Sequence, residues 1–346
     1  MAVRSFSGYS YIVHPNSCGV VYNNNMKYGN LNLKYGLLLA PLAGVTDRSY
    51  RSACFLQGAE LCFTEMVSAK GVVYRDETTI ALADTRKEPG RCAIQIFGSD
   101  PDVTAEAASY LCGLYHSVGM DIKMGCPMKK IVSNGDGSAL MKDPVRAARI
   151  VNAVKKAVSV PVSVKFRTGW DADHRNAVEF AKRLADAGAD LLTVHGRTRE
   201  QIYADPVDYL TIEKVRNAVD GIVLIGNGGI FDRESAKRMA ETGVDGLMLA
   251  RGTMGNPWLF ADLAAMVEGR EYEYPSPSER LQTALAQFEE MIADKGEFYA
   301  VREGRRQIGY YLKGLRGASA GREILNRAEK ADQIRAVILS VIDENV

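Results

Sequence analysis

The stretch Ala187-Gly188-Ala189-Asp190-Leu191-Leu192-Thr193-Val194-His195 decides the fold. Its first four residues are typical of a helix end followed by a glycine turn, and residues 191–195 are predicted to form a strand. Thr242-Gly243-Val244-Asp245 repeats this pattern before the apolar run 246–250. Helix, glycine turn and strand in succession are the units of a parallel α/β fold.

The same alternation begins at about residue 36. Eight apolar runs are predicted to be strands: 37–40, 61–65, 92–97, 120–124, 162–166, 191–195, 222–226 and 246–250. Helices are predicted between them, among others at 103–115, 144–157, 177–187, 206–217 and 233–242. Asp143 and Asp232 are predicted N-caps. Eight strand–helix units predict an α/β fold of the (β/α)8 type, a TIM barrel, rather than an open sheet.

The chain divides into three predicted segments. Residues 26–270 are the predicted barrel domain, and residues 271–346 a C-terminal all-helical domain with helices at 278–295, 299–313 and 331–341. The breaker cluster Tyr274-Pro275-Ser276-Pro277-Ser278-Glu279 lies near their boundary. Residues 1–25 show no clear periodicity and lack the apolar run of a signal peptide, which predicts a disordered extension or a mis-assigned start before Met26.

Composition excludes several classes of protein. The hydrophobic content of 47%, the charged content of 25% and the net charge of +1 are ordinary for a soluble globular protein, so any basic surface must be local. No apolar run is long enough to cross a bilayer, and no membrane association is expected. The six cysteines are irregularly spaced and form no CxxC pair, which favours a reducing cytoplasm with no disulfide framework and no metal site.

Cys126 follows a predicted strand in the run Asp121-Ile122-Lys123-Met124-Gly125-Cys126-Pro127. A strand that ends in Gly-Cys-Pro presents a thiol on a tight turn at the carboxyl edge of the sheet, where the sites of α/β proteins lie. Such a thiol can act as nucleophile, metal ligand or proton donor. The alternative is a packed core thiol.

A phosphate site is predicted after the last two strands. Gly228 and Gly229 allow the backbone to approach a ligand closely, and Arg251 adds charged donors. Loops at this position of a barrel commonly bind phosphate. The alternative is that these glycines serve tight turns alone.

Lys165 alternates with apolar neighbours and is therefore predicted to point into the barrel. A buried lysine needs an anionic partner, and the anionic end of a reduced flavin is one such partner. A structural ion pair with Glu65 is the alternative. His195, with no second histidine nearby in sequence, is predicted to be a hydrogen-bond donor rather than a metal ligand.

Four motifs together resemble the tRNA-dihydrouridine synthases, with the bacterial B-type subgroup most similar. They are Ala40-Pro41-Leu42-Ala43-Gly44-Val45-Thr46-Asp47, Met124-Gly125-Cys126-Pro127, Val194-His195-Gly196-Arg197-Thr198 and Gly255-Asn256-Pro257-Trp258. The resemblance extends from about Gly29 to Ala331. It implies an FMN-dependent TIM barrel with a helical tRNA-binding domain, which reduces the C5–C6 bond of specific uridines in tRNA to 5,6-dihydrouridine with NADPH, or NADH, as reductant.

The resemblance also implies roles for individual residues. Pro41, Leu42 and Ala43 would line the flavin ring, Gln95 would bind its pyrimidine edge, Lys165 its N1 and O2, and His195 the ring and ribityl chain. Asn227, Gly228, Gly229, Ala250 and Arg251 would hold the phosphate. Hydride would pass from N5 to C6 of a flipped-out uridine, Cys126 would protonate C5, and Arg167 would contact the uridine carbonyl edge. A thiol suits this role because its ordinary pKa lies above neutrality.

Three residues depart from the family pattern. Lys123 stands where an asparagine is usual, near the expected flavin and uridine, so a cation there is expected to alter redox potential or uridine fit. Gly229 stands where an aspartate is common. Gln307 replaces a common histidine in the C-terminal helical region.

A local basic surface is predicted in the C-terminal region. Between Arg302 and Lys330, eight basic and three acidic residues are interleaved with Tyr310 and Tyr311, a composition suited to RNA. The residues expected to contact tRNA are Arg305, Arg306, Tyr310 and Lys313, with Lys129 and Lys130 at the mouth of the barrel. A solvated helix face is the alternative explanation of these charges.

Two other functions stay open. An FMN-dependent reductase of a free pyrimidine or small enone needs no basic helical surface, which argues against it. An RNA-binding or regulatory flavoprotein without turnover is favoured only by Lys123 and opposed by Cys126 and Lys165. A cytoplasmic monomer is expected.

Overall fold

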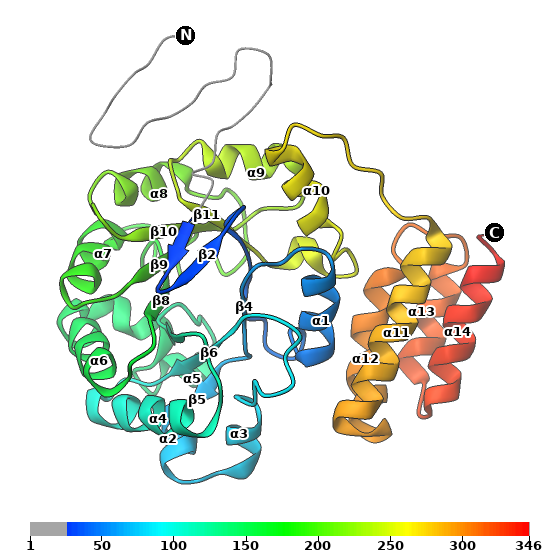
Figure 1. Cartoon of the computed structure of the whole chain (residues 1–346), viewed down its shortest axis with the longest axis horizontal. Coiled ribbons are helices and arrows are strands. Elements are labelled where there is room, and N and C mark those ends of the chain that lie inside the picture. The colour runs from blue at the N-terminus through cyan, green and yellow to red at the C-terminus, as the bar shows by residue number, and fades with distance from the viewer. Residues whose placement is uncertain (1–25, 346) are drawn as a thin grey trace.

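The computed structural model describes residues 26–345. The prediction for residues 1–25 lies outside the described residues. Figure 1 shows a ring of helices around a central parallel barrel and, beside it, a separate group of helices formed by the C-terminal part of the chain.

Eight parallel strands form the barrel, in the order β3-β11-β10-β9-β8-β7-β6-β4. Their bounds are β3 Leu37–Leu39, β4 Cys62–Phe63, β6 Cys92–Phe97, β7 Met120–Lys123, β8 Val162–Arg167, β9 Leu191–His195, β10 Val223–Asn227 and β11 Gly246–Leu249. The first and last strands of this order meet where Leu39 N donates to Leu61 O at 2.9 Å. The predicted TIM barrel is thereby confirmed.

Helices connect successive strands on the outside of the barrel (Figure 1). Asp143 and Asp232 cap two of them by accepting from the N–H groups of Arg146 at 3.0 Å and Ser235 at 2.8 Å, as predicted. The remaining elements of this region are α1 Arg48–Leu56, β5 Val67–Ser68, α2 Ala69–Val73, α3 Glu77–Ala81, α4 Pro101–Leu114, α5 Lys129–Val132, η1 Gly137–Lys142, α6 Pro144–Ala157, α7 Ala177–Asp186, α8 Tyr209–Arg216, α9 Arg233–Ala240, η2 Arg251–Thr253 and α10 Leu259–Val267.

Strand β8 shows how the sequence pattern builds the site. Val162, Val164 and Phe166 belong to the hydrophobic layer between barrel and helices, where the Phe166 ring lies 5.2 Å from that of Phe180. The alternate residues Ser163, Lys165 and Arg167 therefore face the barrel interior. Because the strand is buried on both faces, its polar residues must find partners inside the barrel.

A short antiparallel hairpin closes the amino end of the barrel. It consists of β1 Met26–Tyr28 and β2 Leu31–Leu33, two strands too short to be predicted from the sequence. Met26, Tyr28 and Leu33 pack against buried residues of the barrel strands, and the Tyr28 hydroxyl donates to Ser163 Oγ at 3.3 Å. The open end of the barrel is the carboxyl end, where sites of this fold are built.

The C-terminal helices form a bundle with its own hydrophobic core. They are α11 Pro277–Lys295, α12 Glu297–Tyr311, α13 Ala318–Arg327 and α14 Ala331–Asp343. Helix α13 was not predicted, because its N-cap Gly317 provides no side-chain cap and Gly321 interrupts its apolar spacing. The boundary between residues 270 and 271 falls between α10 and α11 and stays a prediction.

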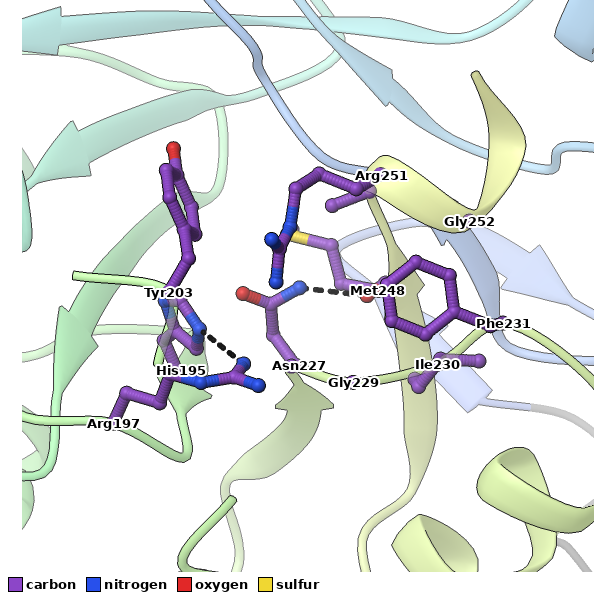
Figure 2. A pocket seen from close by; sticks show the side chains of 12 residues that line it. His195, Arg197, Tyr203, Asn227, Gly229, Ile230, Phe231, Met248, Arg251 and Gly252 are labelled. Atoms are coloured by element: carbon purple, nitrogen blue, oxygen red, sulfur yellow. Dashed lines mark hydrogen bonds between the residues drawn. The ribbon is translucent and has the colours of Figure 1, made fainter. Parts of the chain in front are cut away.

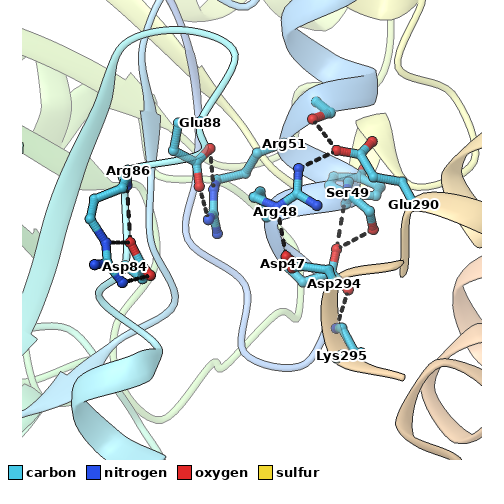
Figure 3. Close-up of polar contacts among 12 residues, drawn as sticks. Asp47, Arg48, Ser49, Arg51, Asp84, Arg86, Glu88, Glu290, Asp294 and Lys295 are labelled. Carbon is cyan, nitrogen blue, oxygen red and sulfur yellow. Dashed lines mark hydrogen bonds and ion pairs between the residues drawn. The ribbon is translucent and has the colours of Figure 1, made fainter. Parts of the chain in front are cut away.

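A polar cluster joins the bundle to the barrel (Figure 3). The buried carboxylate of Asp47 accepts from Lys295 Nζ at 2.6 Å and from Ser49 Oγ at 2.7 Å. Lys295 also bonds to Glu303 at 2.6 Å. Burial alone would raise the pKa of Asp47, but Lys295, Ser49 and the Tyr50 N–H together hold it below its ordinary value.

Lys295→Met is expected to lower the free energy of unfolding by about 1.5–3 kcal/mol at neutral pH, because it removes a charged hydrogen bond from Asp47. Since the folded pKa of Asp47 lies below its ordinary value of 3.8, the stabilisation is present above that pH and is lost as pH falls further. Urea unfolding at pH 7 and at pH 3 measures both effects. Lys182→Met, at an exposed position on α7, is the control; equal losses in the two variants would contradict the assignment.

Candidate active site

Toward its carboxyl end the barrel interior holds three successive layers of polar side chains, and hydrogen bonds join the members of the lowest layer. Gln95 and Asp121 are register partners, as are Asp121 and Ser163. Asp121 Oδ2 accepts from Gln95 Nε2 and its Oδ1 from Ser163 Oγ, both at 2.6 Å. Gln95 Oε1 is buried and has no hydrogen-bond partner among residues 26–345. An unpaired buried acceptor is costly, so this oxygen is available to a hydrogen-bond donor that enters the barrel.

The next layer toward the carboxyl end holds two lysines. Lys123 and Lys165 are register partners on β7 and β8. Lys165, only 5% exposed, donates from Nζ to Asn227 Oδ1 at 2.6 Å. Burial, then Lys123 and Arg167, lower the pKa of Lys165 well below its ordinary value. The predicted inward direction of Lys165 is confirmed.

The alternative of a Lys165–Glu65 ion pair is wrong. The Glu65 carboxylate instead accepts from the N–H of Gly44. Burial raises the pKa of Glu65. This contact holds the loop after β3 against the end of β4, at the carboxyl end of the barrel.

Arg167 and His195, register partners in the third layer, bring two loops together. Arg167 donates from Nε to Gly125 O at 2.8 Å, and from Nη1 to Thr198 O at 2.8 Å and Ile202 O at 2.9 Å. Burial lowers the pKa of Arg167 to about 10. The side chain thus ties the Cys126 turn to the loop after β9, and its predicted contact with uridine stays a prediction.

Hydrogen bonds from Ser138 hold the backbone of the Cys126 turn in place. Cys126 O accepts from Ser138 N at 3.0 Å and from Ser138 Oγ at 2.8 Å. Gly137 has a φ of +60°, and a Cβ there would lie 2.9 Å from Cys126 O. The Cys126 side chain, 5% exposed, belongs to none of the hydrophobic clusters of the described chain. This placement favours a site thiol over a packed core thiol.

Figure 2 shows a pocket at the ends of β10 and β11. Asn227 lines this pocket, and its side chain is held in place by a hydrogen bond from Nδ2 to Met248 O at 2.7 Å. Gly228 and Gly229 have φ values of +118° and +69°, so they supply backbone conformations that other residues rarely adopt. The lining residues are His195, Arg197, Tyr203, Asn227, Gly228, Gly229, Ile230, Phe231, Met248, Ala250, Arg251 and Gly252.

Arg197 is a pocket residue with no role predicted from the sequence. It is 1% exposed, donates from Nε to Ala204 O at 2.7 Å and pairs with Asp205 at 2.6 Å. Its Nη1 lies 3.4 Å from His195 Nε2. Since a guanidinium only donates, His195 Nε2 accepts here and Nδ1 carries the proton. The signal available in the sequence was an arginine two residues beyond a strand-end histidine.

His195 is neutral in this environment. Burial, then the charges of Lys165, Arg167, Arg197 and Lys123, lower its pKa well below the ordinary value. Arg251 faces the pocket from the other side, with its guanidinium 4.4 Å from the centre of the Tyr203 ring. The pocket therefore combines neutral and cationic donors, a set that suits a phosphate.

The loop after β3 forms one side of the mouth. Pro41 is buried, Leu42 is half-buried and Ala43 is exposed. Thr46 Oγ1 accepts from the N–H of Leu42 at 2.8 Å and stiffens the loop. The predicted flavin contacts of these three residues stay predictions, and the structure brings them to the same end of the barrel as Cys126 and Lys165.

The residues predicted to contact tRNA are divided between two surfaces. Lys129 and Lys130 are exposed on α5, just after the Cys126 turn. On the bundle, Arg305 donates to Ala328 O at 2.8 Å, and Tyr310 is half-buried beside Gly255. Arg306 is exposed and donates to Gly44 O at the barrel lip, and Lys313 is exposed. Arg306 thus connects the bundle directly to the mouth.

Two negative findings concern the described residues only. Within residues 26–345, no group of three or more His, Cys, Asp or Glu side chains could hold a metal ion. In the same range, none of the helices is both long and apolar enough to cross a membrane.

The fold and this site define a TIM-barrel protein whose carboxyl end is suited to an anionic ligand. The family model for dihydrouridine synthase (Dus) matches residues 38–345. tRNA-dihydrouridine synthase B of Xanthomonas axonopodis pv. citri is 37% identical over 321 residues, 92% of this chain and 96% of that protein. The protein of the same name from Pseudomonas aeruginosa is 38% identical over 311 residues, 89% of this chain and 92% of its own. The chain belongs to the dihydrouridine synthase family.

Solved structures add only a distant likeness. A crystal structure of mandelate oxidase covers 82% of this chain and 82% of its own, with 16% identity and a TM-score of 0.47. The family assignment depends on the sequence relatives and the family model.

Proposed function

We propose that this protein is an FMN-dependent tRNA-dihydrouridine synthase of the B type, which reduces the C5–C6 bond of specific uridines in tRNA with NADPH or NADH. The observation that carries the proposal is the arrangement at the carboxyl end of the barrel. Gln95 Oε1 is a buried acceptor with no partner in the described chain, and Lys165 and Arg167 are buried cations. Gly228, Gly229 and Arg251 line the pocket at the ends of β10 and β11. The Cys126 turn lies at the same end of the barrel.

The residues present fit FMN. Gln95 Oε1, the acceptor with no partner in the described chain, would accept from the N–H of the pyrimidine ring. Lys165 would lie beside its anionic edge, with Asn227 orienting the ammonium. His195, Gly228, Gly229 and Arg251 would hold the ribityl chain and phosphate, joined by Arg197 from the pocket wall.

The chemistry that bound FMN supplies is hydride transfer between NAD(P)H and C6 of the uridine. The residues of this chain provide the rest. Lys165, whose ammonium is held by Asn227, would stabilise negative charge on the pyrimidine edge, and neutral His195 would donate a hydrogen bond from Nδ1 to the bound cofactor. Cys126 Sγ holds the proton that C5 of the uridine receives. Arg167 and Ser138 position the Cys126 turn from its two sides.

A uridine inside a folded RNA must leave its stack to enter such a barrel. We assign RNA binding to the bundle of residues 271–346 and to the lysines at the barrel mouth, Lys129 and Lys130. Arg306 connects the two surfaces through Gly44 O. Since tRNA is the proposed substrate, we place the enzyme in the cytoplasm and expect it to act as a monomer.

Lys313→Ala is expected to weaken tRNA binding and to reduce the slope of log affinity against log salt by about 1, because one phosphate contact is lost. Titrations of labelled tRNA at several salt concentrations measure both quantities. Lys182→Ala, an exposed lysine on the outer helix α7, is the matched control. An unchanged salt slope in Lys313→Ala would remove this residue from the RNA surface.

The function is tested by following NADPH and NADH oxidation by the purified flavoprotein with two acceptors. Oxidation that depends on tRNA lacking dihydrouridine supports the proposal. Oxidation with free uracil or uridine but not with tRNA would instead show a reductase of small pyrimidines. Bound flavin and tRNA with no oxidation would show a binding protein without turnover.

A further inference from the structure

Lys123 lies in the barrel between two residues that the proposed function assigns to the flavin. In the strand order, β7 lies between β6, which carries Gln95, and β8, which carries Lys165. Lys123 and Lys165 are direct register partners. Neighbouring parallel strands lie about 4.8 Å apart with paired side chains on the same face, so both lysines project into the same part of the interior.

In the described part of the chain, no carboxylate forms an ion pair with either lysine. Within residues 26–345, the Lys123 ammonium makes no hydrogen bond and no ion pair, and the Lys165 ammonium makes only its bond to Asn227. Asp121 lies one layer below, and both of its oxygens accept from other residues, Gln95 and Ser163. Arg167, one layer above, adds a third positive charge.

Two neighbouring cations without an anionic partner lower the free energy of unfolding, and an anion bound between them removes this penalty. Burial lowers the pKa of Lys123 and the charge of Arg167 lowers it further, whereas Cys126 and then Asp121 act in the opposite direction. A negative charge placed between Lys123 and Lys165 would favour the protonated form of both. The lysines and an anionic ligand therefore stabilise each other.

We propose that Lys123 is a second cation, beside Lys165, that holds negative charge at the pyrimidine end of the flavin in this protein. The inference depends on the proposed function, which places a flavin in the site. The residue is a binding group for the N1–C2–O2 edge rather than an acid for the uridine. Its expected effect is to favour every flavin state that carries negative charge at that edge.

Sulfite is a probe of this charge that requires neither tRNA nor NADPH. Its sulfur lone pair forms a bond to flavin N5, and an electron pair of the ring moves to N1 and O2, which then carry the negative charge. A cation at that edge tightens sulfite binding, and the loss of flavin absorbance at its long-wavelength band measures the affinity. The reduction potential of the bound flavin, measured with a reference dye, reports the same interaction independently.

Lys123→Met is expected to weaken sulfite binding roughly tenfold or more and to lower the reduction potential, with flavin content unchanged. Lys123→Arg, which keeps the charge, is expected to retain most of the affinity. Lys182→Met on α7 is the control and should equal the wild type. Flavin content and the thermal unfolding midpoint show that each variant is folded.

Two results would overturn the inference in distinguishable ways. If fully flavinylated Lys123→Met binds sulfite within about twofold of the wild type, Lys123 does not act on the flavin and the proposed function stands unaffected. If the wild-type protein takes up no FMN, the proposed function fails and this inference fails with it.

Discussion

Cys126→Ala is expected to lower the rate of uridine reduction by roughly 10²–10⁴-fold, the range that a positioned general acid contributes. The variant should bind FMN and be reduced by NADPH as the wild type is, because Cys126 is not among the residues that line the proposed phosphate pocket. The turn itself should survive, since its hydrogen bonds to Ser138 and Arg167 are made by the backbone carbonyls of Cys126 and Gly125.

Rapid mixing separates the two half-reactions. Flavin reduction by NADPH and flavin reoxidation by tRNA are followed in the same sample, and only the second should slow. Cys112→Ala, a half-buried thiol on α4, is the control for loss of a cysteine. Reoxidation by tRNA at the wild-type rate in Cys126→Ala would remove Cys126 from the mechanism.

Gly228→Ala is expected to abolish FMN retention during purification and to destabilise the barrel by about 1–3 kcal/mol. A Cβ at this position would lie 2.9 Å from His195 Cδ2 and 3.4 Å from Arg197 Nη1, and the φ of +118° disfavours any L side chain. His195 would have to move, and Arg197, buried and bonded to Ala204 and Asp205, leaves little room for it. The pocket would then lose both its shape and its donors.

Flavin-to-protein ratio and affinity for added FMN measure this effect. Gly58→Ala is the matched control, because Gly58 also has a positive φ, +97°, but has nothing within 4 Å of a new Cβ. The control should lose some stability and keep its flavin. Equal flavin retention in the two variants would show that the Gly228 backbone does not form the phosphate pocket.

The barrel could be predicted from the sequence because each strand is marked locally. Residues 191–195 were predicted as a strand and form β9 with the same bounds, since an apolar run after a glycine turn needs no distant information. The β1–β2 hairpin could not be predicted in the same way. Its residues alternate for only three positions, and what holds it is burial of Met26 and Tyr28 against the amino end of the barrel.

The candidate site could be predicted as a set of residues but not as a set of contacts. Lys165 was placed inside the barrel by its alternation with valines, yet its partner Asn227 is 62 positions away and emerges only when the barrel closes. Arg167 gave the same kind of signal, and the structure uses it to bind Gly125 O. Arg197 stands two residues beyond a strand-end histidine, but that position does not predict its burial, which depends on the loop that returns to Ala204 and Asp205.

The most direct test of the account is the dihydrouridine content of tRNA that lacks this modification, incubated with the protein, FMN and NADPH and mapped by position. We expect dihydrouridine at defined uridines in the wild-type reaction and, over the same time, at least about a hundredfold less with Cys126→Ala. Unmodified tRNA after incubation with fully flavinylated wild-type protein would contradict the proposed function.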